Sequence, residues 1–207
     1  MSEPKEIAQR VEEVADGVWH WRIHNAAIGG GISSSHAVLD PAGGCVLIDP
    51  VRLAPEALGE LPRPDAVALT ARTHQRSAWR YRTGLGAEVW LPEDSSPADE
   101  EPDRRYEDGE RIAGGLVAIR TPGPEWPHYS FLLERDGGIL FCSDLVSHDG
   151  GGRLEYSPFE YHEDPAQTRR TVERLLDLPF AILCFAHGVP LIDDPKTAIR
   201  ELVARES

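Results

Sequence analysis

Short apolar runs of strand length recur along both halves of this chain, and each is bounded by glycine, proline or charged residues. In the first half, strands are predicted for VWHWRI, SSHAVLD, CVLID, AVALT and EVWLP, with helices at LAPEALGEL and SAWRYRTGL. In the second half, HYSFLLERDGGILFCSD predicts a β-hairpin, because Asp136, Gly137 and Gly138 supply the positive φ angles of its turn. Strands and helices thus alternate twice, which predicts an α+β fold of two sheets flanked by helices.

Two helices near the C-terminal end carry clear start signals. Asp164 precedes Pro165, and Asp194 precedes Pro195, so each pair supplies an N-cap followed by proline at the first helical position. No linker or break in composition divides the chain, so we expect one domain over residues 1–207.

The net charge of the chain argues against two classes of binding partner. A formal net charge of −14 argues against nucleic acid and against an anionic membrane surface. No apolar run approaches the roughly 18 residues that cross a bilayer, and the start of the chain is acidic where a secretory signal would be basic. We therefore expect a cytoplasmic protein that acts on a small-molecule substrate or anion, with its oligomeric state left open.

Cysteines and two early histidines are predicted to be structural. Cys45, Cys142 and Cys184 each lie in an apolar run, which favours buried free thiols over disulfides or a metal clip. His20 and His24 alternate with large apolar residues, and we expect both on the solvent face or at a strand edge.

Five short motifs occur in an order that resembles the metallo-β-lactamase superfamily. They are LIDP (47–50), LT (69–70), TPG (121–123), FCSD (141–144) and AHG (186–188), and the resemblance spans roughly residues 14–203. It implies a four-layer αββα sandwich with one or two metal ions, usually zinc, held by histidines and aspartates at strand ends. It also implies hydrolysis of an ester, amide, thioester or phosphodiester bond by metal-bound hydroxide.

The HxHxDH loop of that superfamily is degenerate here. Ala71, Thr73, Gln75 and Arg76 stand where the pattern has His, His, Asp and His, and Pro124 stands where a histidine would follow TPG. Every departure removes a metal ligand, and Arg76 adds a fixed positive charge. Because a two-metal site needs five or more ligands, we expect the usual two-metal chemistry to be lost.

The resemblance leaves a smaller set of candidate metal ligands. Asp144 and His187 match ligand positions, His74 and His128 are irregular additions, and Asp49 matches the supporting aspartate. Three or four such ligands are a normal number for a single zinc ion. One interpretation is therefore a divergent hydrolase with a mononuclear or weakly bound zinc, iron or manganese ion.

A metal-free interpretation stays open beside it. Here Asp144 and His187 are relics that pair with Arg72 or Arg76, since a neighbouring arginine keeps a carboxylate ionised. Together with Arg80 and Arg82, these arginines could form an anion pocket in a non-catalytic binding protein; surface ion pairing along a helix is the plainer explanation of the series.

Overall fold

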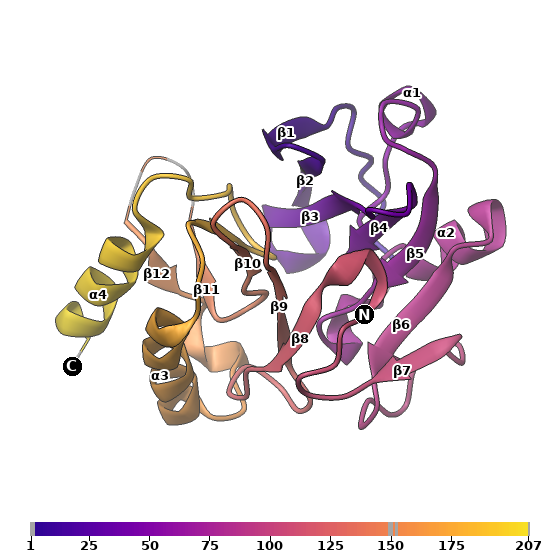
Figure 1. Cartoon of the computed structure of the whole chain (residues 1–207). Coiled ribbons are helices and arrows are strands. Elements are labelled where there is room, and N and C mark those ends of the chain that lie inside the picture. Colours follow the sequence, from indigo (N-terminus) through magenta and orange to yellow (C-terminus); the bar gives the residue numbers. More distant parts are fainter. Residues whose placement is uncertain (1–2, 149–150, 152, 207) are drawn as a thin grey trace.

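The computed structural model describes residues 3–148, 151 and 153–206, and in these residues three apolar cores separate four layers. One core lies between the two main sheets, and the other two lie under the helices on either outer face. Figure 1 shows α1 and α2 beside one sheet, and α3 and α4 together beside the other. The predicted α+β, four-layer sandwich is thus the observed architecture.

The larger sheet has the strand order β1-β2-β3-β4-β5-β6-β7. Its first four strands pair antiparallel, and β4 to β7 pair parallel. The strands are β1 Glu12–Ala15, β2 Val18–Asn25, β3 Gly31–Leu39, β4 Cys45–Ile48, β5 Pro64–Ala68, β6 Glu88–Pro92 and β7 Arg104–Tyr106.

The smaller sheet has the order β13-β10-β9-β8, with β13 parallel to β10 and the other pairs antiparallel. A two-stranded sheet joins β11 and β12. The strands are β8 Val117–Arg120, β9 Tyr129–Leu133, β10 Ile139–Phe141, β11 Val146–Ser147, β12 Glu155–Tyr156 and β13 Ile182–Cys184.

Helices cover the outer faces of both main sheets. They are α1 Pro55–Leu58, α2 Ala78–Leu85, α3 Pro165–Arg174 and α4 Pro195–Arg205. Asp164 and Asp194 cap α3 and α4 by accepting hydrogen bonds from the N–H groups of Gln167 and Thr197, as the sequence predicts. None of the described helices is both long and apolar enough to cross a membrane.

Strand β4 shows why the apolar runs are continuous. Cys45 and Leu47 point into the core under α1 and α2, whereas Val46 and Ile48 point into the core between the sheets. Both faces of the strand are therefore buried, and no polar residue interrupts it. All three cysteines are buried and free, which confirms their predicted structural role.

The expectation for His20 is wrong. Its side chain is only 2% exposed and stacks against His36, with ring centroids 5.2 Å apart, whereas His24 is exposed as expected. His20 and Val18 lie on the face of β2 that covers the core between the sheets, and the same face reaches solvent only at Arg22 and His24.

Candidate metal site

Four strand ends bring the candidate residues to one rim of the sandwich. Strands β4 and β5 are parallel, as are β10 and β13, so each pair ends on the same edge of its sheet. Asp49 follows β4, the turn Arg72–Gln75 follows β5, Asp144 follows β10 and His187 follows β13. Residues far apart in the chain therefore meet because the topology places their strand ends together.

Three of the predicted ligands form a cluster. One donor atom from each of His74, Asp144 and His187 lies within 4.8 Å of the others, and this group could hold a metal ion. Nε2 of His74 lies 3.0 Å from Oδ2 of Asp144, and Nε2 of His187 lies 3.1 Å from Oδ1. Asp144 thus stands between two imidazole rings.

Both rings are held from behind. Nδ1 of His187 lies 2.6 Å from the carbonyl oxygen of Ile32, which can only accept, so Nδ1 carries the proton. Nδ1 of His74 lies 3.0 Å from Oδ2 of Asp49. Such a carboxylate or carbonyl behind an imidazole orients the ring and leaves Nε2 free to bind a metal ion.

The surroundings of Asp144 show whether the clustered residues suit a metal ion. Its Oδ1 is buried and has no hydrogen-bond partner among the described residues, although Nε2 of His187 is close, so that contact lies outside hydrogen-bond geometry. A buried carboxylate oxygen without a partner is costly. Two imidazole nitrogens and a carboxylate oxygen are also a normal donor set for a divalent ion such as zinc, so the residues fit one.

Without a metal ion, a proton on His74 offsets the negative charges of the neighbouring carboxylates. Burial lowers the pKa of His74, but the Asp144 carboxylate and then Asp49 raise it, to about 10. Burial raises the pKa of Asp144, yet the charges of His74 and His187 hold it well below its usual range. His74 then bridges two carboxylates as an imidazolium.

His128 is not brought into the cluster. Nδ1 of its buried ring lies 2.8 Å from the carbonyl oxygen of Thr121, and Nε2 accepts a hydrogen bond from the Asp144 N–H at 3.3 Å. Burial lowers the pKa of His128 to about 4, so the ring is neutral. Both nitrogens are occupied, and His128 supports the backbone of Asp144 from below.

Arg76 is buried beneath the site. Its guanidinium donates to the carbonyl oxygens of Ser34 at 2.7 Å, Asp49 at 2.9 Å and Ala186 at 3.4 Å. These carbonyls belong to β3 and to the segments that follow β4 and β13, so Arg76 ties three strands together. Its backbone has φ 36° and ψ −111°, a strained conformation that the surrounding contacts must hold in place.

The other arginines do not gather around an anion pocket. Arg80 pairs with Glu3, and Arg82 pairs with Asp103 at the surface. Arg72 is half-buried, and its side chain makes no ion pair with the described residues. The expected pairing of Asp144 with Arg72 or Arg76 is replaced by its contacts with two histidines.

Glu125 is a site neighbour that the sequence pattern does not reveal. It follows Pro124, and its Oε1 accepts hydrogen bonds from the backbone N–H and the hydroxyl of Thr73, the residue before His74. Burial raises its pKa against the opposing effect of the Thr73 hydrogen bond, and its charge interacts with those of His74 and Asp144. Glu125 belongs to no motif with a recognisable spacing, so the sequence alone does not indicate that it lies beside the site.

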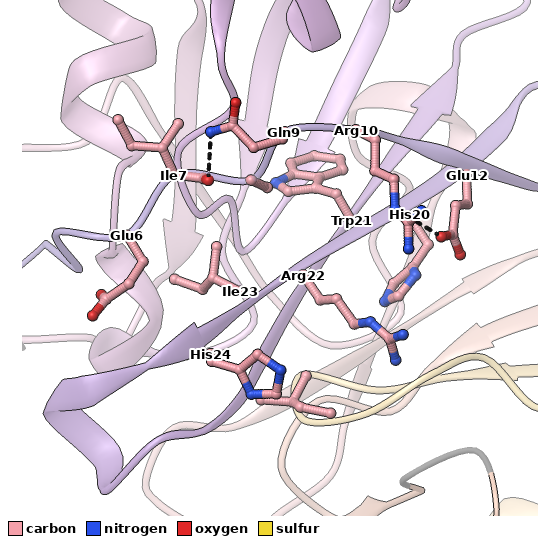
Figure 2. A pocket seen from close by; sticks show the side chains of 12 residues that line it. Glu6, Ile7, Gln9, Arg10, Glu12, His20, Trp21, Arg22, Ile23 and His24 are labelled. Carbon is pink, nitrogen blue, oxygen red and sulfur yellow. Dashed lines mark hydrogen bonds and ion pairs between the residues drawn. The ribbon is translucent and has the colours of Figure 1, made fainter.

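A groove of about 450 Å³ lies along β2, between this strand and the N-terminal segment. Figure 2 shows Arg22 and His24 on its strand side and Glu6 and Gln9 on the N-terminal segment that borders it. Ile32 lines this groove and also supplies the carbonyl that holds His187. The groove contains none of the clustered ligands.

Comparisons with solved structures identify the fold. A metallo-beta-lactamase family protein from Thermus thermophilus matches with a TM-score of 0.70 and 19% identity, over 94% of this chain and 80% of that chain. A metallo-beta-lactamase from Pontibacter korlensis matches with a TM-score of 0.71 and 17% identity, over 94% and 98%. An archaeal metallo-beta-lactamase superfamily protein from Sulfolobus tokodaii matches with a TM-score of 0.67 and 15% identity, over 90% and 85%.

No protein-family model matches the chain, and no curated protein sequence does. The structural matches nevertheless cover nearly the whole chain. The protein therefore has the metallo-β-lactamase fold, as its motif order implies.

Proposed function

We propose that this protein is a hydrolase that binds one divalent metal ion through His74, Asp144 and His187. The observation that carries the proposal is the convergence of three donor atoms, from three separate strand ends, within 4.8 Å. Zinc is the ion that best suits two imidazoles and a carboxylate, with iron and manganese as the alternatives. The substrate is a small molecule with an ester, amide, thioester or phosphodiester bond, acted on in the cytoplasm.

A metal ion held by three protein ligands lowers the pKa of a bound water to about 7 and polarises the substrate oxygen. The residues of the chain prepare the site for this chemistry. Asp49 and the Ile32 carbonyl fix the two histidine rings, and the rim position leaves His187 and Asp144 partly open to solvent. Three protein ligands leave a coordination position for water or substrate.

One ion is proposed rather than two. Ala71, Thr73, Gln75 and Pro124 offer no ligand of the usual kind, and Arg76 places a permanent positive charge that interacts with Asp49 and Asp144. Burying a second cation close to that guanidinium is unfavourable because like charges repel strongly in a weakly screened interior.

Metal analysis of protein purified without chelator tests the proposal. We expect close to one equivalent of zinc, iron or manganese, and a higher melting temperature when that ion is added back after chelation. His187→Ala should lose both effects. Metal-free protein that gains no stability from any of these ions would refute the hydrolase.

A metal-free binding protein is the second candidate, and the proton balance of the cluster favours it. His74 lies between Asp49 and Asp144 as an ion pair that needs no metal. In that case His187→Ala changes only the stability of the fold, and no ion alters the melting temperature of the wild type.

A further inference from the structure

The turn that carries His74 lacks a cap of its own. Ala71 stands at its N-cap position and has no side chain that can accept a hydrogen bond, and His74 itself has non-helical angles of φ −93° and ψ 19°. The first N–H groups of any helical turn have no partner inside the turn. The turn therefore depends on an acceptor from elsewhere in the chain.

Glu125 provides that acceptor from the loop between β8 and β9. Its Oε1 receives the Thr73 N–H at 3.3 Å and also the Thr73 hydroxyl. Its Oε2 makes no hydrogen bond with the described residues, so the side chain is anchored through one oxygen only. A carboxylate near the first N–H groups of a turn is also favoured by the dipoles of the peptide groups.

The same loop is tied to the turn at other points. Ala71 and His128 form an isolated antiparallel bridge, and the Tyr129 N–H donates to the Thr70 carbonyl at 2.9 Å. These backbone contacts fix the start of the turn, at Thr70 and Ala71. Among these contacts of the loop, the one between Glu125 and Thr73 lies nearest to His74 along the chain.

We propose that Glu125 is a positioning residue that sets the direction of His74 through Thr73. This rests on the proposed function, because the readout is metal binding by His74. Asp49 holds Nδ1 of the ring, and Glu125 holds the backbone from which the ring projects. Nδ1 also lies 3.1 Å from Oγ1 of Thr70 and 3.3 Å from Oγ of Ser143. Loss of the Glu125 contact frees the backbone at Thr73 and lets the whole ring shift, so that Nε2 of His74 moves away from Asp144 and His187.

Zinc affinity, measured by competition with a chromophoric chelator, tests the proposal. Glu125→Ala should weaken zinc binding about tenfold to a hundredfold, the usual effect of removing a group that orients a ligand. Glu125→Gln keeps an oxygen acceptor for Thr73 and should stay within about threefold of the wild type. Thr73→Val, which removes the hydroxyl without changing the shape, should show an intermediate loss.

Glu163→Ala is the matched control. It removes an exposed carboxylate from the loop whose Glu163 N–H donates to the Pro124 carbonyl, and it leaves Thr73 untouched. Its zinc affinity should equal that of the wild type. The visible absorption spectrum of the cobalt-loaded protein should change in Glu125→Ala and return in Glu125→Gln, because the spectrum reports ligand geometry.

The outcomes separate the two proposals. If the wild type binds zinc and Glu125→Ala binds it equally well with the same cobalt spectrum, the positioning role is overturned and the hydrolase stands. Equal losses in Glu125→Ala and Glu125→Gln also overturn it, because charge would then be the cause. A wild type that binds no metal overturns both. If urea titrations with chelator show that Glu125→Ala is unfolded, the zinc affinity of Thr73→Val is used instead. A weaker affinity than that of the wild type supports the positioning role, and an equal affinity overturns it.

Discussion

Arg76 offers the sharpest test of how the site is held. Replacing it with methionine keeps most of the side-chain volume and removes the guanidinium. Two of its bonds to backbone carbonyls are short, at 2.7 and 2.9 Å, and the third is 3.4 Å. Each short bond from a charged donor contributes about 1.5–3 kcal/mol, and the third adds little.

We therefore expect Arg76→Met to lower the free energy of unfolding by about 3–6 kcal/mol, because two buried carbonyl oxygens lose a charged donor. Urea unfolding with a chelator present measures this loss without any contribution from metal binding. The m-value should stay unchanged, because the fold itself is retained.

Arg72→Met is the matched control for this experiment. Arg72 lies four residues earlier, is half-buried and makes no ion pair with the described part of the chain. Its replacement should change the free energy of unfolding by no more than about 0.5 kcal/mol. A loss below about 1 kcal/mol in Arg76→Met, or an equal loss in both variants, would refute the view that Arg76 ties the three strands together.

Four further predictions follow from the site and the caps. In metal-free protein, burial lowers the pKa of His74 but Asp144 and Asp49 raise it from 6.5 to about 10, so the stability lost in His74→Gln should be largest below pH 6.5. That loss should shrink as the pH rises toward 10, and urea titrations showing a constant difference would contradict it. Asp49→Asn should weaken zinc binding about tenfold to a hundredfold in chelator competition, since the charge behind His74 is lost. Arg76→His should bind no second equivalent of metal; two equivalents by elemental analysis would overturn the assignment of the loop positions. Asp194→Ala should cost about 1 kcal/mol in urea unfolding and Asp194→Asn less, because only the alanine removes the cap.

Local signals predict much of the framework. Asp164 and Asp194, each followed by proline, mark the starts of α3 and α4, because capping depends on neighbouring residues alone. The hairpin turn at 136–138 has positive φ at all three positions, as its composition requires. Such features need no knowledge of the rest of the chain.

Features that depend on distant contacts are harder to predict. The strand containing His20 has two faces that alternate, but the pattern does not say how far along each face the second sheet extends. The polar face covers the core at Val18 and His20 and reaches solvent at Arg22. A histidine at such a boundary is assigned correctly only when the partner sheet is known.

The same limit explains why the candidate metal ligands are only partly visible in the sequence. Asp144 and His187 each lie three residues after the end of a strand, so the order of motifs is enough to find them. His74 stands at a variable position of the degenerate loop, and its ring is aimed by Asp49 and by a turn that Glu125 caps. Spacing within the loop cannot reveal an orientation that two other segments impose. A rim that lacks the usual motif can therefore still bring together side chains that could hold a metal ion, as long as the strand ends and the contacts behind the rings remain.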